Sequence, residues 1–530
     1  MKRVLVALII ITMLTITNTV ARSEDVSSVK KHFGGTLVWG THTKPTMINP
    51  LFTRFSVSAS LIDLLFNRLV RINSRGEIEP DLAKSWEISE DGLVYTFYLK
   101  KGVKFHDGQE CRAEDVEFTY NMLMDPEVNS PHRSSFEMVR DFKTIDRYTF
   151  QIILKKPSGF FIYRLAREIV PKHLLDKTNV KVSSFNFHPV GTGPFKFKEW
   201  TKDDRITLEY NPDYYEGRPY LDRIVVKTYP DSKELWTALM RKEVDLVLFI
   251  EKEDYEIVKI DTAFKSYAVP IDHYYALCYN LDDPILSDIR VRKAIAHSID
   301  RGELINIVAD GYGVECNGPF YPGYLGFNPD IDSFKYNPEK AEKLLDECGW
   351  LDQDKDRIRK KAGETLKIKV LVDQRYAIFK RIAMVIRQQL QEIGVVVKVV
   401  LYDDERMVIE EFIEQHNAQA HLRLFFAGDP ENIMHNWGPK EIKGVDKIWI
   451  YENVKVNKLF EETKIEPNET KRDQIFQEIH KLVYSYQPAC FLYFICDFNI
   501  ISARFKNTDE FFTPGMPFYT MKDWYFSEDN

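Results

Sequence analysis

Three residues early in the chain, Asp91, His106 and Asp107, combine carboxylates with an imidazole and could act as acids, bases or metal ligands. Each lies in a short polar stretch beside a glycine, with Gly92 after Asp91 and Gly108 after Asp107. Asp and Gly are favoured in tight turns for backbone reasons. We therefore interpret all three as turn residues and expect no catalytic site here.

Motifs that would indicate catalysis or a resident metal are missing. The sequence contains no HExxH, GxSxG, P-loop or CxxC pattern. Residues 190–195 read VGTGPF, but a phosphate-binding loop needs a helix directly after it, and the following residues alternate as strands do. The 6 cysteines are widely spaced, so disulfide connectivity stays open. We expect no enzymatic activity, no cofactor and no metal.

The predicted strands and helices indicate where ligand-binding side chains lie. Residues 366–372 alternate as a strand, residues 378–393 repeat apolar positions as a helix, and residues 395–401 form the next strand. Such a β-α-β unit implies parallel strands joined by a right-handed crossover. In open α/β sheets, ligands bind beyond the carboxyl ends of the strands. The rule points to three loops: residues 40–49, 373–376 and 428–432.

The remaining elements fit the same class. Residues 337–349 predict a complete helix, because Asn337 can cap it, Pro338 suits its first position and Gly349 its exit. Residues 86–105 predict three meandering strands, followed by a helix over 116–123. Alternation of strands and helices elsewhere indicates an α/β protein.

The whole chain is 530 residues long, 44% hydrophobic and carries a formal net charge of −8. This length predicts two or three domains, and without a basic cluster we expect no nucleic-acid partner. Lys2 and Arg3 precede an apolar run over 4–14, and small residues end at Ala21. This is typical of a cleaved signal peptide over 1–21. No cysteine lies at the cleavage site, so we expect no lipid anchor in the membrane. We expect the protein to be exported to the periplasm and to be a monomer.

The stretch 79–123 resembles the signature region of the family 5 extracellular solute-binding proteins, the dipeptide, oligopeptide and nickel receptors of ABC importers. Pro-x-Leu-Ala-x-Ser-Trp-Glu is met at 80–87, Asp-Gly-Leu-x-Tyr-Thr-Phe at 91–97, and Gly-Val-x-Phe-x-Asp-Gly at 102–108. Ala-x-Asp-Val follows at 113–116, Gly-Thr-Gly-Pro at 191–194 and Val-Arg-x-Ala at 291–294. The order of these landmarks is similar to the family over nearly the whole mature chain.

The resemblance implies an α/β periplasmic binding protein with two lobes, hinge crossings near 270 and 488, and an extra α+β domain inserted in lobe one. Lobe one is then expected over residues 34–50, 190–270 and 489–530. The inserted domain is expected over 51–189, and lobe two over 271–488.

The resemblance also implies ligand-binding residues. Arg375 and Tyr376 occupy the place of a ligand-contacting arginine and tyrosine, although Arg375 could equally be a solvated residue at a helix start. Asp429 lies near the place of the carboxylate that holds a peptide ammonium group. The additional Asp of dipeptide receptors is missing from this loop, so Asp429 could also be only a turn residue before Pro430. The expected set is Arg375, Tyr376, Asp429, Phe426, Trp437 and Met47, of which Phe426 and Trp437 could instead be core.

The function that this implies is a periplasmic receptor that closes its two lobes around a peptide and delivers it to the permease of an ABC importer. A nickel chelate, an opine or an oligosaccharide is the alternative ligand within the same fold. A secreted hydrolase is a rival that would need a nucleophile or metal site. A periplasmic chaperone is another, and it would prefer unfolded proteins to short ligands.

Overall fold

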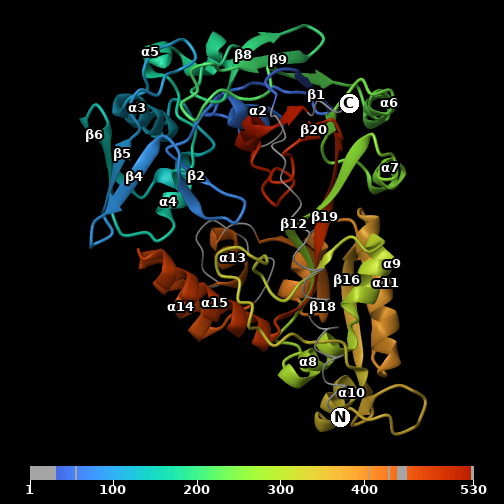
Figure 1. The fold of residues 1–530 in the computed structure, drawn as a ribbon. Coiled ribbons are helices and arrows are strands. Elements are labelled where there is room, and N and C mark those ends of the chain that lie inside the picture. The colour runs from blue at the N-terminus through green and yellow to red at the C-terminus, as the bar shows by residue number, and fades with distance from the viewer. Residues whose placement is uncertain (1–31, 54–56, 405, 428–429, 439–450, 527–530) are drawn as a thin grey trace, which may run out of the picture.

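A computed structural model describes residues 32–53, 57–404, 406–427, 430–438 and 451–526. The chain forms two lobes, one above the other in Figure 1, with the inserted domain beside them. The predicted signal peptide lies outside the described residues. Among the residues that are described, no helix combines the length and apolar character needed to cross a membrane.

One mixed sheet runs through both lobes, in the strand order β17-β16-β18-β12-β19-β11-β1-β10-β9-β8. Its two central strands, β12 (Phe264–Tyr279) and β19 (Ala489–Ser502), are antiparallel and belong to both lobes. Their pairing runs from Phe264 with Ser502 to Cys278 with Ala489, and the register shifts between Pro270 and Tyr274. Since Pro270 pairs with Cys496, the strands cross between the lobes near residues 270 and 496. The first crossing lies where it was expected, whereas the second lies inside β19 and not near 488. The predicted two-lobed α/β fold is confirmed.

Lobe one is built around β1, whose neighbours β10 and β11 are parallel to it. Strands β9 and β8 continue the sheet in antiparallel fashion. Helix α2 belongs to the hydrophobic cluster on one face, whereas α6 and α7 belong to the cluster on the other. The bounds are β1 Thr36–Thr41, α2 Val57–Leu65, β8 Phe195–Trp200, β9 Arg205–Tyr210, β10 Arg223–Thr228, α6 Ser232–Met240, β11 Leu246–Val247 and α7 Lys252–Val258.

Lobe two contains the predicted β-α-β unit. Strands β16 and β17 are parallel in full register, with α11 between them along the chain. Residues 289–309 form two helices and not one, because Asp300 caps a new start by accepting the Glu303 N–H at 2.9 Å. The bounds are α8 Ile289–Ser298, α9 Arg301–Ala309, α10 Pro338–Glu347, β16 Lys367–Asp373, α11 Ala377–Glu392, β17 Val396–Tyr402, β18 Ala420–Phe426, α13 Pro430–Trp437, α14 Val454–Ile465 and α15 Glu469–Tyr486.

The inserted domain is α+β. Its antiparallel sheet has the strand order β4-β5-β7-β6, and α3 packs against β6 and β7. The predicted third strand over 103–105 is wrong: this segment forms only an isolated antiparallel bridge, between Lys104 and Glu110, and β7 pairs with β5 in its place. The bounds are β2 Val70–Ile72, β3 Ile78–Pro80, β4 Ala83–Ile88, β5 Val94–Leu99, α3 Ala113–Met124, β6 Val139–Asp146, β7 Thr149–Leu154, α4 Phe161–Arg164 and α5 Lys172–Leu175.

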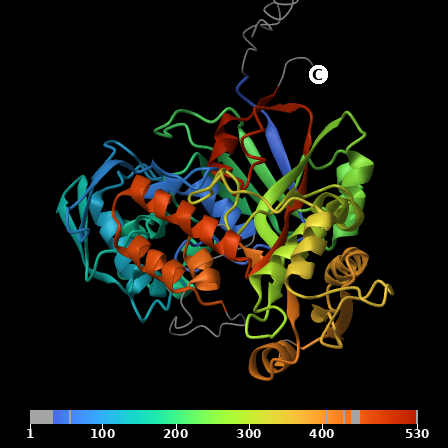
Figure 2. The ribbon, with the colours of Figure 1, turned by 90° about the horizontal axis from the view of Figure 1, so that it is seen from below.

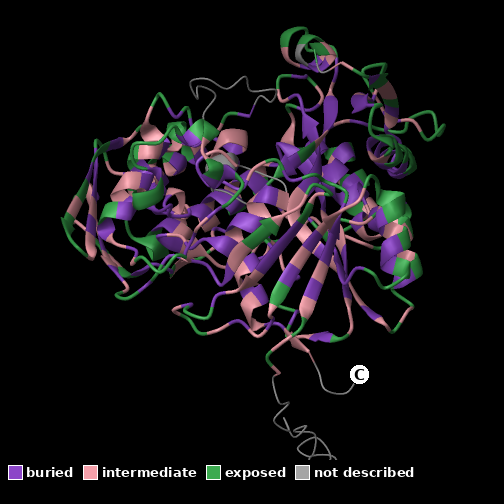
Figure 3. Ribbon diagram, turned by 90° about the horizontal axis from the view of Figure 1, so that it is seen from above, coloured by how far each residue is buried: buried purple, intermediate pink, exposed green. Residues whose placement is uncertain are grey.

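Buried residues run along the strands of the long sheet and the helix faces that cover it, as Figure 3 shows. All 6 cysteines are free thiols in this structure, and only Cys496, at the hinge, is not fully buried. The glycine-rich stretch 190–195 is a packing site. Added Cβ atoms at Gly191 and Gly193 would lie 2.0 Å from the carbonyl oxygen of Leu65 and 2.5 Å from its carbonyl carbon. As predicted, a strand follows this stretch and no phosphate-binding helix does.

Candidate functional site

The carboxyl ends of the strands in lobe two lie at the edge near the hinge. Strand β18 runs antiparallel to β12, so that its last residue, Phe426, pairs with His273 just beyond the hinge bulge. The next residue, Ala427, donates its N–H to the Asp272 carbonyl at 2.7 Å. The strand-end rule therefore places the candidate site between lobe two and the elements across the hinge.

Arg375 and Tyr376 follow the carboxyl end of β16, as predicted. Arg375 donates from Nε and Nη2 to the Asp373 carboxylate, at 2.9 Å to Oδ1 and 2.6 Å to Oδ2. These hydrogen bonds hold the pKa of Asp373 below its ordinary value. The Tyr376 ring is 56% exposed and its centre lies 5.8 Å from the guanidinium carbon of Arg375. Tyr376 borders a groove with Tyr275 and Phe379 on lobe two.

The other predicted residues are dispersed. Phe426 is 39% exposed, with its ring 5.0 Å from that of His273. Trp437 is fully buried and its indole N–H donates to the Tyr274 hydroxyl at 3.1 Å. In this arrangement Trp437 therefore packs as a core residue and has no surface for a ligand. Met47 is half-buried between β1 and α2, and Asp429 lies outside the described residues.

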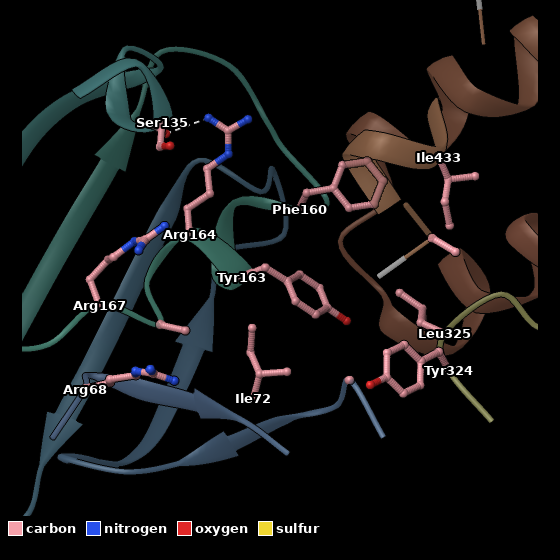
Figure 4. Close-up of a pocket in the computed structure, with 13 residues that line it drawn as sticks. Arg68, Ile72, Ser135, Phe160, Tyr163, Arg164, Arg167, Tyr324, Leu325 and Ile433 are labelled. Atoms are coloured by element: carbon pink, nitrogen blue, oxygen red, sulfur yellow. Dashed lines mark hydrogen bonds between the residues drawn. The ribbon is translucent and has the colours of Figure 1, made fainter. Parts of the chain in front are cut away.

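A cavity of about 350 Å³ lies between the inserted domain and lobe two, and we call it the interlobe cavity. Figure 4 shows its two walls, one from β2, α4 and the residues after α4, the other from the loop around Tyr324 and from α13. It is lined by Arg68, Ile72, Gly76, Ser135, Phe160, Tyr163, Arg164, Ala166, Arg167, Tyr324, Leu325, Ala427 and Ile433. Because its walls come from the inserted domain and from lobe two, a ligand there contacts both domains at once.

The wall from the inserted domain carries three arginines: Arg68, Arg164 and Arg167 (Figure 4). Arg68 is held by two carboxylates, through an ion pair with Asp63 and through its Nε to Glu168 Oε1 at 2.8 Å. Burial opposes ionisation of Glu168, but the charges of Arg68 and Arg167, together with the hydrogen bonds that the carboxylate accepts, lower the Glu168 pKa. Arg164 Nη1 donates to the Ser135 carbonyl at 2.6 Å. A guanidinium presents a planar fork that suits a carboxylate.

Aromatic rings occupy the part of the cavity between the two walls. Phe160 and Tyr163 come from the inserted domain and Tyr324 from lobe two (Figure 4). The Tyr163 hydroxyl is buried, and the charged side chains of Glu469 and Arg472 in α15 lie close to it. Burial also raises the pKa of Tyr163 to about 12, which keeps it a neutral hydrogen-bond donor. Rings of this kind offer apolar contact with a polar tip.

Charged groups of the opposite sign lie at the hinge. Asp272 pairs with His273 across 3.1 Å, and Asp497 lies on β19 close to both. Burial raises the pKa of Asp497 to about 6, and the Asp272 charge adds to this, while His273 opposes it. The pKa of Tyr324, which lines the interlobe cavity, is raised above its ordinary value, mainly by burial. The negative charge of Asp272 raises it further. The hinge is thus more acidic than the arginine wall.

The sequence analysis missed the residues of the interlobe cavity. Tyr163, Arg164 and Arg167 lie in and after a four-residue helix, too short for a periodic pattern to reveal. They meet Tyr324 only through the docking of two domains. No group of three or more potential metal ligands occurs among the described residues.

Comparisons with known proteins agree with this architecture. The model of the bacterial extracellular solute-binding proteins, family 5, matches residues 77–444, more than half of the chain. The oligopeptide-binding protein AppA of Bacillus subtilis is 29% identical over 519 residues, which is 96% of this chain and 94% of AppA. The solved structure of AppA with a nonapeptide matches with a TM-score of 0.62 at 27% identity. The match covers 94% of this chain and 100% of the AppA chain.

Two further relatives carry different ligands in their names. The dipeptide-binding protein of Escherichia coli is 26% identical over 490 residues, 86% of this chain and 88% of that protein. NikZ from Campylobacter jejuni, solved with Ni(L-His), is 26% identical with a TM-score of 0.66, covering 92% of this chain and 99% of NikZ. The long family match and these full-length similarities show that the chain belongs to the family 5 bacterial extracellular solute-binding proteins.

Proposed function

We propose that this protein is the receptor of an ABC importer and that it binds short peptides in the interlobe cavity. The observation that carries the proposal is a cavity between the inserted domain and lobe two, with three arginines on one wall and aromatic rings beside them. Similarity to the oligopeptide- and dipeptide-binding relatives supports a peptide as the ligand. The family consists of solute-binding receptors and not of enzymes.

The arginine wall is suited to the peptide's carboxylate. Hydrogen bonds between guanidinium and carboxylate are charge-assisted and about twice as strong as neutral ones. Arg68, Arg164 and Arg167 all line the cavity, and we assign the ligand's carboxylate to this arginine wall. The rings of Tyr163 and Tyr324 would then cover the peptide's last side chains. Generic contacts of this kind explain tolerance of different side chains.

The size of the interlobe cavity favours a short ligand. A volume of about 350 Å³ lies at the small end of ligand sites, which run from roughly 300 to 1,000 Å³. Two or three peptide residues match such a site better than a long extended chain does.

Closure of the lobes completes the proposed mechanism. A ligand that contacts both walls stabilises the closed arrangement by its differential affinity for the two states. The carboxyl end of β16 then approaches lobe one, so we retain Arg375 and Tyr376 as proposed contacts of the closed state. Removal of residues 1–21 on export and delivery to a permease belong to the same proposal.

A metal chelate is the second candidate. The described residues offer no metal-ligand cluster of their own, yet arginines can hold the carboxylates of a chelator. Similarity to NikZ, whose structure contains Ni(L-His), favours this alternative over an opine or an oligosaccharide.

Calorimetry with trialanine, its carboxyl-amidated form and its N-acetylated form tests the proposal. We expect trialanine to bind and the amidated form to lose at least about tenfold in affinity, since its carboxylate is gone. Nickel with excess histidine is the comparison ligand. Binding of the nickel complex without binding of any peptide would replace the peptide proposal by the chelate one.

A further inference from the structure

The inserted domain and lobe two contact each other directly through Gly159 and Phe160, in the segment between β7 and α4. Figures 1 and 2 show α14 and α15 of lobe two beside the inserted domain. The Gly159 N–H donates to the Lys464 carbonyl at 2.6 Å, near the end of α14. The last carbonyls of a helix lack partners within it, so this hydrogen bond satisfies one of them across the domain boundary.

Phe160 occupies the hydrophobic core of lobe two although it belongs to the inserted domain. It is only 4% exposed, and its ring lies 5.6 Å from that of Phe476 in α15. The Arg472 guanidinium lies 5.9 Å from the centre of the same ring. Phe160 also lines the interlobe cavity. The same contact therefore joins the two domains and forms part of the cavity wall.

The segment is held rigidly on its own side. The Tyr95 hydroxyl, from β5, donates to the Ser158 carbonyl at 2.9 Å. The ring of Tyr95 lies 5.4 Å from that of Phe161, edge to face. Phe161, in turn, is fully buried in the core of the inserted domain. Docking of Gly159 and Phe160 thus positions the whole domain and not merely a loop.

The close approach at Gly159 depends on the absence of a side chain. A Cβ atom there would lie 2.3 Å from the Thr463 carbonyl oxygen and 2.8 Å from the Glu466 carbonyl oxygen. Both are backbone atoms, which cannot rotate away. The φ angle of Gly159 is not in the left-handed region, so an alanine there fits the local backbone. Alanine is therefore incompatible with the docked arrangement but not with the fold of either domain.

We propose that Gly159 and Phe160 form a clasp between the inserted domain and lobe two, which holds the two walls of the interlobe cavity together and so sets ligand affinity. Gly159 is a positioning residue, because it does not line the cavity itself. The apparent affinity of a receptor falls with the fraction of molecules in the binding-competent arrangement. Loss of the clasp lowers that fraction without touching the arginines.

The test compares Gly159→Ala with wild type by two measurements: small-angle scattering without any ligand, and calorimetry with trialanine. We expect a larger radius of gyration and at least about tenfold weaker binding in Gly159→Ala, because the docked fraction falls. Unchanged thermal unfolding by circular dichroism confirms that the domains still fold. Gly302→Ala, in α9, is the matched control, since its added Cβ would meet nothing closer than 3.4 Å.

The effect on affinity rests on the proposed function, whereas the effect on shape does not. If trialanine binds neither wild type nor variant, the peptide proposal fails and scattering alone decides the clasp. Equal radii for folded Gly159→Ala and wild type overturn the clasp. A larger radius with unchanged trialanine affinity also overturns it, because the clasp would then not hold the binding walls.

Discussion

At the scale of single residues, the family motifs and the residues that line the interlobe cavity are different sets. Asp91 and Asp107 serve turns, as expected: Asp91 Oδ1 accepts the Leu93 N–H at 3.0 Å, and Asp107 Oδ1 accepts the Gln109 N–H at 3.1 Å. The His106 ring contacts the Gly193 carbonyl at 3.1 Å. The arginines of the cavity, by contrast, stand in no motif. Residues that bind a variable ligand need not follow a local sequence pattern. Tight turns do follow one, because their backbone geometry favours particular residue types.

Replacing Arg167 by alanine tests the arginine wall. We expect trialanine binding to weaken by roughly 1.5–3 kcal/mol, the range for hydrogen bonds to charged groups. Arg290→Ala is the control, because Arg290 is exposed on α8 and pairs with Asp288 at 2.6 Å. Calorimetry on the three proteins gives the answer. If Arg167→Ala and wild type bind trialanine with equal affinity, the assignment of the peptide's carboxylate to this wall is wrong.

Arg375→Ala tests the contact proposed for the closed state. In this structure Arg375 is engaged by Asp373, and closure has to offer it a better partner. We expect a loss of roughly 1.5–3 kcal/mol in peptide affinity with little change in unfolding temperature. Undiminished binding for every ligand that wild type binds would refute the assignment of Arg375.

Asp497 predicts a pH-dependent contribution to stability. Its pKa is raised to about 6 in the fold, against roughly 3.9 in an unfolded chain. The folded state therefore binds more protons, and this contribution to stability is present at low pH and is lost as pH rises through about 6. Asp497→Asn should raise the free energy of unfolding by about 2 kcal/mol at pH 7 and change it little at pH 4.

Urea denaturation at both pH values measures this difference for Asp497→Asn. The exposed Asp352, changed to asparagine, is the control, and it should show no such pH dependence. A stabilisation of Asp497→Asn that is equal at pH 4 and pH 7 would show that burial of the charge is not its cause.

At the scale of elements, local rules predicted helices and parallel strands well. Asn337 caps α10 by accepting the Lys340 N–H at 2.8 Å, with Pro338 at the helix start. The β-α-β unit is present as expected, because apolar residues repeat clearly at strand spacing in both strands and at helix spacing between them. The strand over 103–105 failed because two apolar residues alternate equally well in turns. The docking of Phe160 on Phe476 could not be predicted, since it joins segments far apart in the sequence.

The Val-Arg-x-Ala motif at 291–294 has a structural explanation at this scale. Arg292 is 1% exposed and donates from Nε to the Gln487 carbonyl and from Nη2 to the Tyr486 carbonyl, both at 2.9 Å. Its Nη1 donates to the Leu286 carbonyl at 2.7 Å. Arg292 thus joins the start of α8 to the end of α15.

Arg292→Met should lower the free energy of unfolding by about 3 kcal/mol, because four carbonyls, those of Leu286, Ser287, Tyr486 and Gln487, lose a partner. The exposed neighbour Arg290, changed to alanine, should cost less than about 1 kcal/mol. Urea denaturation compares the two variants. Similar small losses in both would show that Arg292 is not the link between the two helices.

At the scale of the whole molecule, the fold class followed from the motifs, and the long sheet shows how the lobes are joined. Strands β12 and β19 carry the chain between lobes, and their register shift near Pro270 supplies the bend. Motion about this pair changes the distance between the walls of the interlobe cavity. The predicted domain limits at 51–189 and 271–488 stay predictions, whereas the cavity between the inserted domain and lobe two is a property of the structure.

Small-angle scattering during a trialanine titration tests the central claim most directly, namely that a peptide bound between the lobes closes them. The account predicts that the radius of gyration falls with increasing ligand and reaches its minimum at the saturation measured by calorimetry. Carboxyl-amidated trialanine at the same concentration should leave the radius near its ligand-free value. Saturated binding of trialanine with no change in the radius of gyration would contradict the account.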